Sequence, residues 1–208
     1  MSVRVKICGL TNLSDARTAW RAGADLLGFI MVAESARYVA PERAAAMVAA
    51  LRQEGCQALM VGVYAGTPIE FVRRTADLIG LDLVQLHGDE APAEAATVGR
   101  PAIVARRVRQ RAPWDELARY DAWACLLDSH VPGRLGGTGQ TWEYRLALEG
   151  RPDGARVILA GGLDPDNVAE AVRAARPWGV DVATGVEREP GRKDPARVAA
   201  FVQRAKEA

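Results

Sequence analysis

Short apolar segments alternate with longer amphipathic ones eight times along this chain, and that alternation limits the folds open to it. Strands separated by helical crossovers pair in parallel within one sheet. Eight strand–helix units fill the 208 residues without a linker or a low-complexity tract. The pattern predicts an α/β fold with a single domain over residues 1–208, a (β/α)8 barrel of the TIM type. The alternative is an open doubly wound sheet, which the lack of a Gly-x-Gly-x-x-Gly after the first strand disfavours.

The expected elements follow from apolar runs, helical periodicity, and the prolines and glycines at their ends. The predicted strands are Val3–Cys8, Leu26–Val32, Gln57–Ala65, Leu83–His87, Ala102–Val108, Ala122–Ser129, Arg156–Ala160 and Gly179–Ala183. The predicted helices are Ser14–Ala22, Pro41–Arg52, Pro68–Ile79, Ala91–Val98, Trp114–Tyr120, Pro165–Ala175 and Pro195–Ala205, with a less regular one near Trp142–Leu148.

Composition excludes several classes of function. The chain is 49% hydrophobic and 25% charged with a net charge of +1, so nothing in its charge favours a nucleic acid or an anionic membrane as partner. No apolar run approaches the ~18 residues that a membrane span needs, and the N-terminus lacks the apolar region of a signal peptide. Cys8, Cys56 and Cys125 are scattered and odd in number, so we expect reduced thiols in a cytoplasmic protein.

Four polar residues stand at or near the ends of predicted strands: Cys8, His87, Asp128 and Asp181. The active site of a (β/α)8 barrel lies at the C-terminal ends of its strands. Side chains also alternate between the two faces of a strand, so that Cys8 shares its face with Lys6. We therefore expect the four side chains to surround one mouth of the barrel.

A thiol and a carboxylate placed in this way form a candidate proton-transfer pair. A free cysteine is usually a small buried apolar residue, but Cys8 stands at a strand end before Gly9. Asp128 ends an apolar run and precedes a long loop, which makes a helix-capping role less suitable. Lys6, about 6–7 Å back along the strand, would favour the thiolate, the basic form. A structural ion pair with a carboxylate inside the barrel is the equal alternative for Lys6, and Cys56 and Cys125 are interpreted as structural.

The remaining polar residues of the mouth have two interpretations each. Aspartate is unfavourable in strands, so Asp181 is expected either to contact a substrate or to pair with Lys6. His87 could be structural or catalytic, and His130, in a loop, is interpreted as solvated. Neither histidine belongs to a cluster with metal-ligand spacing, so we predict no metal, and no motif indicates an organic cofactor.

Glycine-rich segments follow the last predicted strands. Gly161 and Gly162 follow the seventh strand, and Thr184 and Gly185 follow the eighth. In barrels of this type the loops after these two strands often hold a phosphate through backbone N–H groups at the start of a short helix. Each glycine alone could serve only a turn. Together they predict a phosphorylated small molecule as ligand.

Arg37, in Ser35–Tyr38 after the second strand, is the candidate for a second anion. We expect it across the mouth from the glycine loops, where a guanidinium could bind a carboxylate through two hydrogen bonds. A solvated surface position is the alternative.

These segments, in this order, resemble phosphoribosylanthranilate isomerase of tryptophan biosynthesis over essentially the whole chain. The segments that carry the resemblance are Lys6–Thr11, Ser35–Tyr38, Val84–Gly88, Leu126–Ser129, Gly136–Gly139, Leu159–Leu163 and Gly185–Glu187. The family converts N-(5-phosphoribosyl)anthranilate into 1-(2-carboxyphenylamino)-1-deoxyribulose 5-phosphate by an Amadori rearrangement. The resemblance implies a cofactor-free enzyme, a monomer or homodimer, with the following site: Cys8 as general base, Asp128 as general acid, substrate contacts by Arg37, His87 and Asp181, and phosphate on Gly161, Gly162, Thr184 and Gly185.

The chain departs from the family's usual residues in four places: Met31–Glu34, Tyr64–Gly66, Trp142–Tyr144 and Ala183–Thr184. The first and the last of these bear on the proposed site. Met31–Glu34 stands where an aromatic and a basic residue are usual and is expected to change the pocket wall around the anthranilate ring. Ala183 and Thr184 replace two serines, which should matter little if backbone N–H groups hold the phosphate. Two other functions stay open: a histidine-pathway-type aminoaldose-phosphate isomerase, which typically uses two aspartates instead of Cys8, and a non-catalytic phosphosugar-binding barrel.

Overall fold

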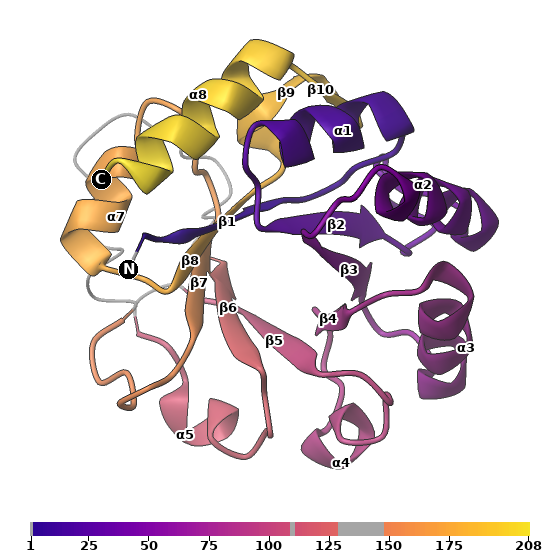
Figure 1. Ribbon diagram of the computed structural model, residues 1–208. Helices are drawn as coiled ribbons and strands as arrows, with labels where there is room; N and C mark the ends of the chain where they lie inside the picture. The colour runs from indigo at the N-terminus through magenta and orange to yellow at the C-terminus, as the bar shows by residue number, and fades with distance from the viewer. Residues whose placement is uncertain (1, 109–110, 129–147) are drawn as a thin grey trace.

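Eight parallel strands close into a barrel that helices surround (Figure 1). The computed structural model describes residues 2–108, 111–128 and 148–208. The barrel strands are β1 (Arg4–Ile7), β2 (Leu26–Ile30), β3 (Leu59–Tyr64), β4 (Leu83–Leu86), β5 (Ala102–Arg107), β6 (Ala124–Asp128), β7 (Val157–Ala160) and β8 (Gly179–Val182). They follow one another around the ring in chain order, and β8 pairs with β1 to close it.

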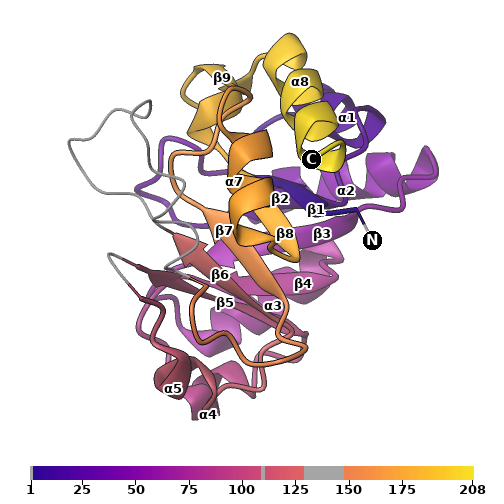
Figure 2. The ribbon, with the colours of Figure 1, turned by 90° about the vertical axis from the view of Figure 1, so that its left-hand side faces the viewer.

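Helices connect the strands on the outside of the barrel. They are α1 (Leu13–Arg21), α2 (Pro41–Gln53), α3 (Ile69–Ile79), α4 (Pro92–Ala95), α5 (Trp114–Leu117), α7 (Val168–Ala175) and α8 (Pro195–Lys206). The side view shows α8 beside both α1 and α7 (Figure 2). Within the described ranges, no helix has the length and apolar character needed to cross a membrane.

The barrel predicted from the sequence is confirmed, and each observed strand lies inside its predicted range. The helices α4, α5 and α7 are shorter than predicted. Sequence reasoning missed three short elements after β8: a 3₁₀ turn, η1 (Thr184–Val186), and a hairpin of β9 (Glu187–Glu189) and β10 (Arg192–Lys193). The Gly136–Gly139 segment, His130 and most of the expected helix near Trp142–Leu148 lie outside the described residues.

The core has two layers because strand side chains alternate between the barrel interior and the helices. The interior layer contains strand residues only: Leu26, Val61, Leu83, Ile103, Ala105, Ala124, Leu126, Ile158 and Ala160. The outer layer joins the other strand faces to the helices, as with Phe29 of β2 and Phe201 of α8. Ala124 and Leu126 face the interior as predicted, and the same alternation directs Asp128 toward the mouth.

Aromatic side chains pack below this interior layer, at the N-terminal ends of the strands. Trp123 and Trp178 precede β6 and β8, pack against the interior cluster, and meet edge to face with ring centroids 5.2 Å apart. The Arg156 guanidinium lies 4.9 Å from the Trp123 ring centroid. Large rings at this end bury apolar area, whereas the opposite end carries the polar residues.

Two aspartates tie neighbouring strands together just before β2 and β4. Asp25 accepts a hydrogen bond from the Val5 backbone N–H at 2.9 Å and pairs with Arg4 and Lys206. Asp82 accepts one from the Met60 N–H at 2.7 Å. Each carboxylate thus satisfies a backbone donor at the second residue of the preceding strand.

Replacement of Asp25 by asparagine should destabilise the barrel in a pH-dependent way. Burial alone would raise the pKa of Asp25, but hydrogen bonds from Val5, Arg4 and Lys206 hold it below its usual value. A pKa that is lower in the folded state stabilises the folded protein at every pH above the unfolded-state pKa, which is about 3.9 for aspartate. This stabilisation is lost as the pH falls through the folded-state pKa. We expect Asp25→Asn to lower the free energy of unfolding by about 1–2 kcal/mol at pH 7, with the difference shrinking below about pH 4.

Urea denaturation at several pH values measures this difference. Asp121→Asn, at an exposed position, is the matched control and should change stability by less than about 0.5 kcal/mol. A difference that stays constant between pH 7 and pH 3 would contradict the electrostatic account of Asp25.

Candidate active site

The mouth at the C-terminal ends of the strands gathers the residues that the sequence singled out. Cys8 follows β1, His87 follows β4, Asp128 ends β6, and Asp181 lies within β8. All eight strands are parallel and belong to one closed barrel. The four residues therefore share one end of the fold, where such barrels carry their active sites.

A buried ion pair lies directly beneath this mouth. Lys6 Nζ lies 3.0 Å from Asp181 Oδ1, and the Lys6 side chain is only 1% exposed. The two residues face each other in the β1–β8 register. A Cβ placed on Gly28 would lie 2.8 Å from Cys8 Sγ and 3.2 Å from Lys6 Nζ. The thiol and the ammonium thus both border the space above Gly28, so that Lys6 pairs with Asp181 and lies beside Cys8 at the same time.

The protonation states of Cys8 and Lys6 follow from burial and charge. Burial raises the pKa of the Cys8 thiol and outweighs the Lys6 ammonium, which lowers it. Burial would lower the pKa of Lys6, but the Asp181 carboxylate and Cys8 raise it above its ordinary value. Lys6 thus lowers the pKa of Cys8, as the sequence analysis expects. The net effect is nevertheless a thiol that stays protonated at neutral pH in the free protein.

His87 and Asp128 lie side by side on the other part of the rim. Their closest atoms, Nε2 and Oδ2, are 3.9 Å apart, which is beyond hydrogen-bonding distance. Burial lowers the pKa of His87 more than the Asp128 charge raises it, so the imidazole is neutral at pH 7. Among the described residues, buried His87 Nε2 has no hydrogen-bond partner, and neither has Gln85 Oε1. Buried polar atoms normally have a partner, so these two atoms are exceptions among the described residues.

Arg37 does not lie where the sequence analysis placed it. Its Nε and Nη2 donate to the two carboxylate oxygens of Glu187 at 2.8 and 2.6 Å, and Nη2 lies 3.5 Å from Thr184 Oγ1. Arg37 is thus beside the loop after β8, and its expected position across the mouth from the glycine loops is wrong. The reason is ring closure: β2 is separated from β8 only by β1.

The two glycine loops are in direct contact. A Cβ on Gly185 would collide with the carbonyl oxygen of Leu163. Gly162 has a φ of +70° and open space where a Cβ would be, and its carbonyl accepts a hydrogen bond from Asn167 Nδ2 at 2.8 Å. Arg197 Nε donates to the carbonyl oxygen of Gly185 at 3.0 Å. The loops that carry the predicted phosphate-binding residues are therefore in contact with each other, and hydrogen bonds from Asn167 and Arg197 hold them in place.

Comparisons with known proteins decide the family. The family model for N-(5'-phosphoribosyl)anthranilate isomerase matches residues 5–204. The N-(5'-phosphoribosyl)anthranilate isomerase of Citrifermentans bemidjiense is 47% identical over 205 residues, which are 98% of this chain and 97% of that protein.

The chain belongs to the phosphoribosylanthranilate isomerase family. Solved structures agree with this assignment. The phosphoribosyl anthranilate isomerase of Thermotoga maritima has a TM-score of 0.87 and 36% identity, with 99% of this chain and 100% of that chain covered. A phosphoribosyl anthranilate isomerase in complex with reduced 1-(o-carboxyphenylamino)-1-deoxyribulose 5-phosphate has a TM-score of 0.85 and 33% identity, with the same coverage.

Several buried residues beside the isomerase mouth were not found from the sequence. Glu187 and Lys193 are 3% and 1% exposed and pair at 2.9 Å. Glu90 is 8% exposed and accepts the backbone N–H groups of Gly66 and Gly88. Charged residues are mostly exposed, so the residue types alone did not indicate that these side chains are buried. The position of Glu187 directly after a predicted phosphate loop was the one available indication.

The four residues of the departure at Met31–Glu34 differ in burial. Met31 is 5% exposed and belongs to the outer core layer. Val32 is half-buried, whereas Ala33 and Glu34 are exposed. A changed pocket wall would therefore have to come from the residues after Met31.

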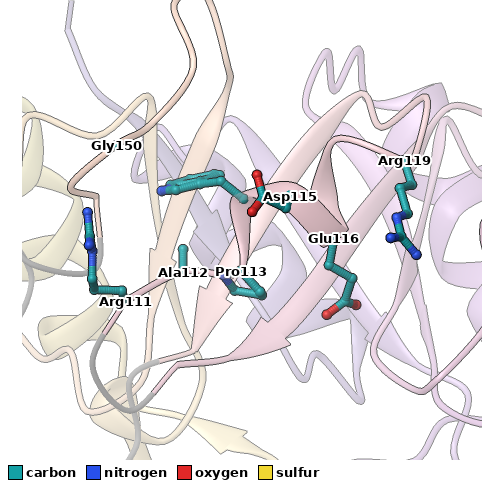
Figure 3. Close-up of a pocket in the computed structure, with 8 residues that line it drawn as sticks. Arg111, Ala112, Pro113, Asp115, Glu116, Arg119 and Gly150 are labelled. Atoms are coloured by element: carbon teal, nitrogen blue, oxygen red, sulfur yellow. The ribbon is translucent and has the colours of Figure 1, made fainter.

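A separate hollow of about 650 Å³ lies around the start of α5. Figure 3 shows Arg111 and Arg119 at its opposite ends. Its other lining residues are Ala112, Pro113, Trp114, Asp115, Glu116 and Gly150. It contains none of the predicted site residues. In the part of the chain that the structure describes, no group of three or more His, Cys, Asp or Glu residues could hold a metal ion.

Loss of the Lys6 ammonium should destabilise the isomerase strongly. Lys6→Met leaves Asp181, whose side chain is only 12% exposed, without its cation, and removal of one partner of a buried pair costs about 3–5 kcal/mol. Arg73→Met, which breaks the exposed pair with Glu70, is the control and should cost less than about 1 kcal/mol. Urea unfolding measures both, and equal small effects would show that the Lys6–Asp181 pair is not coupled to folding.

Proposed function

We propose that this mouth carries the family's reaction, with Cys8 as general base and Asp128 as general acid. The reaction is the rearrangement of N-(5'-phosphoribosyl)anthranilate, an aminoaldose, to the aminoketose 1-(2-carboxyphenylamino)-1-deoxyribulose 5-phosphate. The observation that carries the proposal is a thiol after β1 and a carboxylate at the end of β6, both at the mouth of one closed barrel.

Asp128 acts in the first step, the opening of the ribose ring. The anilino nitrogen donates its electron pair to C1 as the C1–O bond breaks, and the ring oxygen takes a proton from the Asp128 carboxylic acid. The products are a protonated imine and a free hydroxyl. Asp128 lies next to a neutral His87, whose unpartnered Nε2 can hydrogen-bond to the sugar in the same part of the mouth.

Cys8 acts in the second step, removal of the proton from C2. The positively charged imine acidifies this proton, and the electron pair of the C–H bond forms the C1–C2 double bond of an enolamine. Return of a proton to C1 and loss of the proton from the C2 hydroxyl give the aminoketose. A positive charge near a thiol lowers its pKa, so the imine formed in the first step favours loss of the Cys8 proton to solvent. The resulting thiolate accepts the C2 proton. Positioned acid–base groups of this kind contribute about 10²–10⁴-fold each.

Arg37, His87 and Asp181 are proposed to orient the substrate. Asp181 Oδ1 is held by Lys6, which leaves Oδ2 as its oxygen for a sugar hydroxyl. The Arg37 guanidinium carries a charge that suits the anthranilate carboxylate. Phosphate is proposed to bind the backbone N–H groups at Gly161, Gly162, Thr184 and Gly185, and the contact between the two loops supports a single anion site there.

The same proposal covers assembly and location. It assigns one catalytic domain over residues 1–208, active as a monomer or homodimer in the cytoplasm. The three free cysteines support the location, because reduced thiols are usual in that compartment. The histidine-pathway type of isomerase is not favoured, because the base position holds Cys8 in a chain that belongs to the phosphoribosylanthranilate isomerase family.

Turnover of phosphoribosylanthranilate by the purified chain tests the function, and Cys8→Ala and Asp128→Asn test the roles. Each variant should lower kcat by about 10²–10⁴-fold, because each removes one proton-transfer group. Cys125→Ala, at a half-buried cysteine on β6, and the exposed Asp121→Asn are the matched controls and should keep wild-type kcat. Product formation is measured by chromatography, and near-wild-type kcat in either test variant would remove that residue from its role.

Backbone binding of the phosphate predicts different effects at neighbouring positions. Gly162→Val should raise KM sharply, because a side chain there is strained at a φ of +70° and would fill the open space above the loop. Thr184→Ala removes one hydroxyl and should cost no more than about 0.5–1.5 kcal/mol of binding. The KM values for substrate measure both, and a larger effect at Thr184 than at Gly162 would contradict backbone binding.

A further inference from the structure

The guanidinium of Arg37 is fixed by a single carboxylate from the segment after β8. Glu187 accepts two hydrogen bonds from it, from Nε at 2.8 Å and from Nη2 at 2.6 Å. A planar guanidinium held along its Nε–Nη2 edge has its orientation determined. Its remaining edge, Nη1 with Nη2, is then presented in one direction: Nη2 also faces Thr184 Oγ1 at 3.5 Å, at the limit of a hydrogen bond, and among the described residues Nη1 has no hydrogen-bond partner.

Glu187 is itself held in place by the β9–β10 hairpin. Lys193 Nζ donates to Glu187 Oε1 at 2.9 Å and to the Ala183 carbonyl oxygen at 3.0 Å. The backbone N–H of Gly191 lies 3.3 Å from the same carboxylate oxygen. Thr11 Oγ1 donates to the Gly191 carbonyl at 2.6 Å, which ties the hairpin to the loop after β1.

The charges of this cluster add up to one positive charge. Glu187 is 3% exposed, and it lies between a Lys193 that is 1% exposed and the partly exposed Arg37. A carboxylate paired with Arg37 alone would neutralise the guanidinium and weaken its attraction for an anion. Because Lys193 offsets the charge of Glu187, the Arg37 charge remains available at the mouth.

We infer that Glu187 is a positioning residue that orients Arg37 for a planar carboxylate on the ligand, with Lys193 as its charge partner. The inference rests on the proposed role of Arg37 toward the anthranilate carboxylate. Glu187 then determines discrimination between carboxylated and uncarboxylated ligands, because it fixes the direction of the second guanidinium edge. It does not contribute to phosphate binding or to proton transfer.

Binding of two matched compounds tests this role. The first is reduced 1-(o-carboxyphenylamino)-1-deoxyribulose 5-phosphate, and the second is its phenylamino counterpart without the carboxylate. Their dissociation constants are measured by calorimetry for the full chain and its variants, since the affinity of the folded fraction does not depend on how much protein is folded. The readout is the ratio of the two constants, which a purely structural defect would leave unchanged.

Glu187→Gln should weaken binding of the carboxylated compound about tenfold or more, equivalent to ~1.4 kcal/mol, and change the other compound less than threefold. Glu187→Gln combined with Lys193→Met should reduce the ratio similarly, without leaving a buried lysine unpaired. Glu189→Gln, an exposed glutamate on the same strand β9, is the control and should keep the wild-type ratio. Arg37→Met should abolish most of the discrimination, and Glu187→Gln should have little further effect in that background.

The possible results separate this inference from the proposed function. If Arg37→Met reduces the ratio while both Glu187 variants keep it, Glu187 does not position Arg37, and the proposed role of Arg37 stands. If Arg37→Met keeps the wild-type ratio, Arg37 does not bind the carboxylate, and both proposals about it fail. Reduced ratios in all three variants support the inference.

Discussion

The pairing of β8 with β1 closes the barrel, and the site depends on that seam. Arg4 to Ile7 face Gly179 to Val182 in register, and the Cys8 N–H continues the ladder by donating to Val182 at 2.8 Å. The Lys6–Asp181 pair lies in the same seam, although its members are 175 positions apart in the sequence. Parallel closure therefore brings the base, its neighbouring cation and the loops after β7 and β8 to one mouth. An open sheet would leave β1 and β8 without this contact.

The seam also determines the reactivity of Cys8. Desolvation disfavours a thiolate, and here it exceeds the opposing effect of Lys6. A buried thiol that is protonated at rest is less exposed to unwanted reactions than a permanent thiolate. The proposed mechanism uses this property, since the imine cation that forms in the first step appears when the base is needed. Lys6 and the imine then act on Cys8 in the same direction, while Asp181 keeps the lysine charge compensated.

The fold and most of the mouth could be predicted because they depend on patterns that a sequence displays directly. Apolar runs, helical periodicity and the glycines between them located β1 to β8. The alternation of side chains along β6, with Ala124 and Leu126 facing the interior, placed Asp128 at the mouth. The β9–β10 hairpin could not be predicted, because Glu187–Glu189 and Arg192–Lys193 are short, charged and without apolar alternation. The position of Arg37 was missed for a different reason. Arg37 lies beside Glu187 because closure of the barrel brings the segment after β8 close to β2, and because Glu187 is buried there. Neither fact can be read from a local sequence pattern.

Gly28 shows how one small residue makes this arrangement possible. It lies in β2, next to β1 in the ring, and a methyl group there would approach Cys8 Sγ to 2.8 Å and Lys6 Nζ to 3.2 Å. Both distances are shorter than ordinary van der Waals contact, so the thiol and the ammonium can lie side by side only if position 28 lacks a side chain. Glycine within a strand weakens it, and its presence at Gly28 marks a close approach. The residues of β2 therefore serve two purposes. Its apolar side chains form the barrel wall, and Gly28 leaves room for the base and its cation.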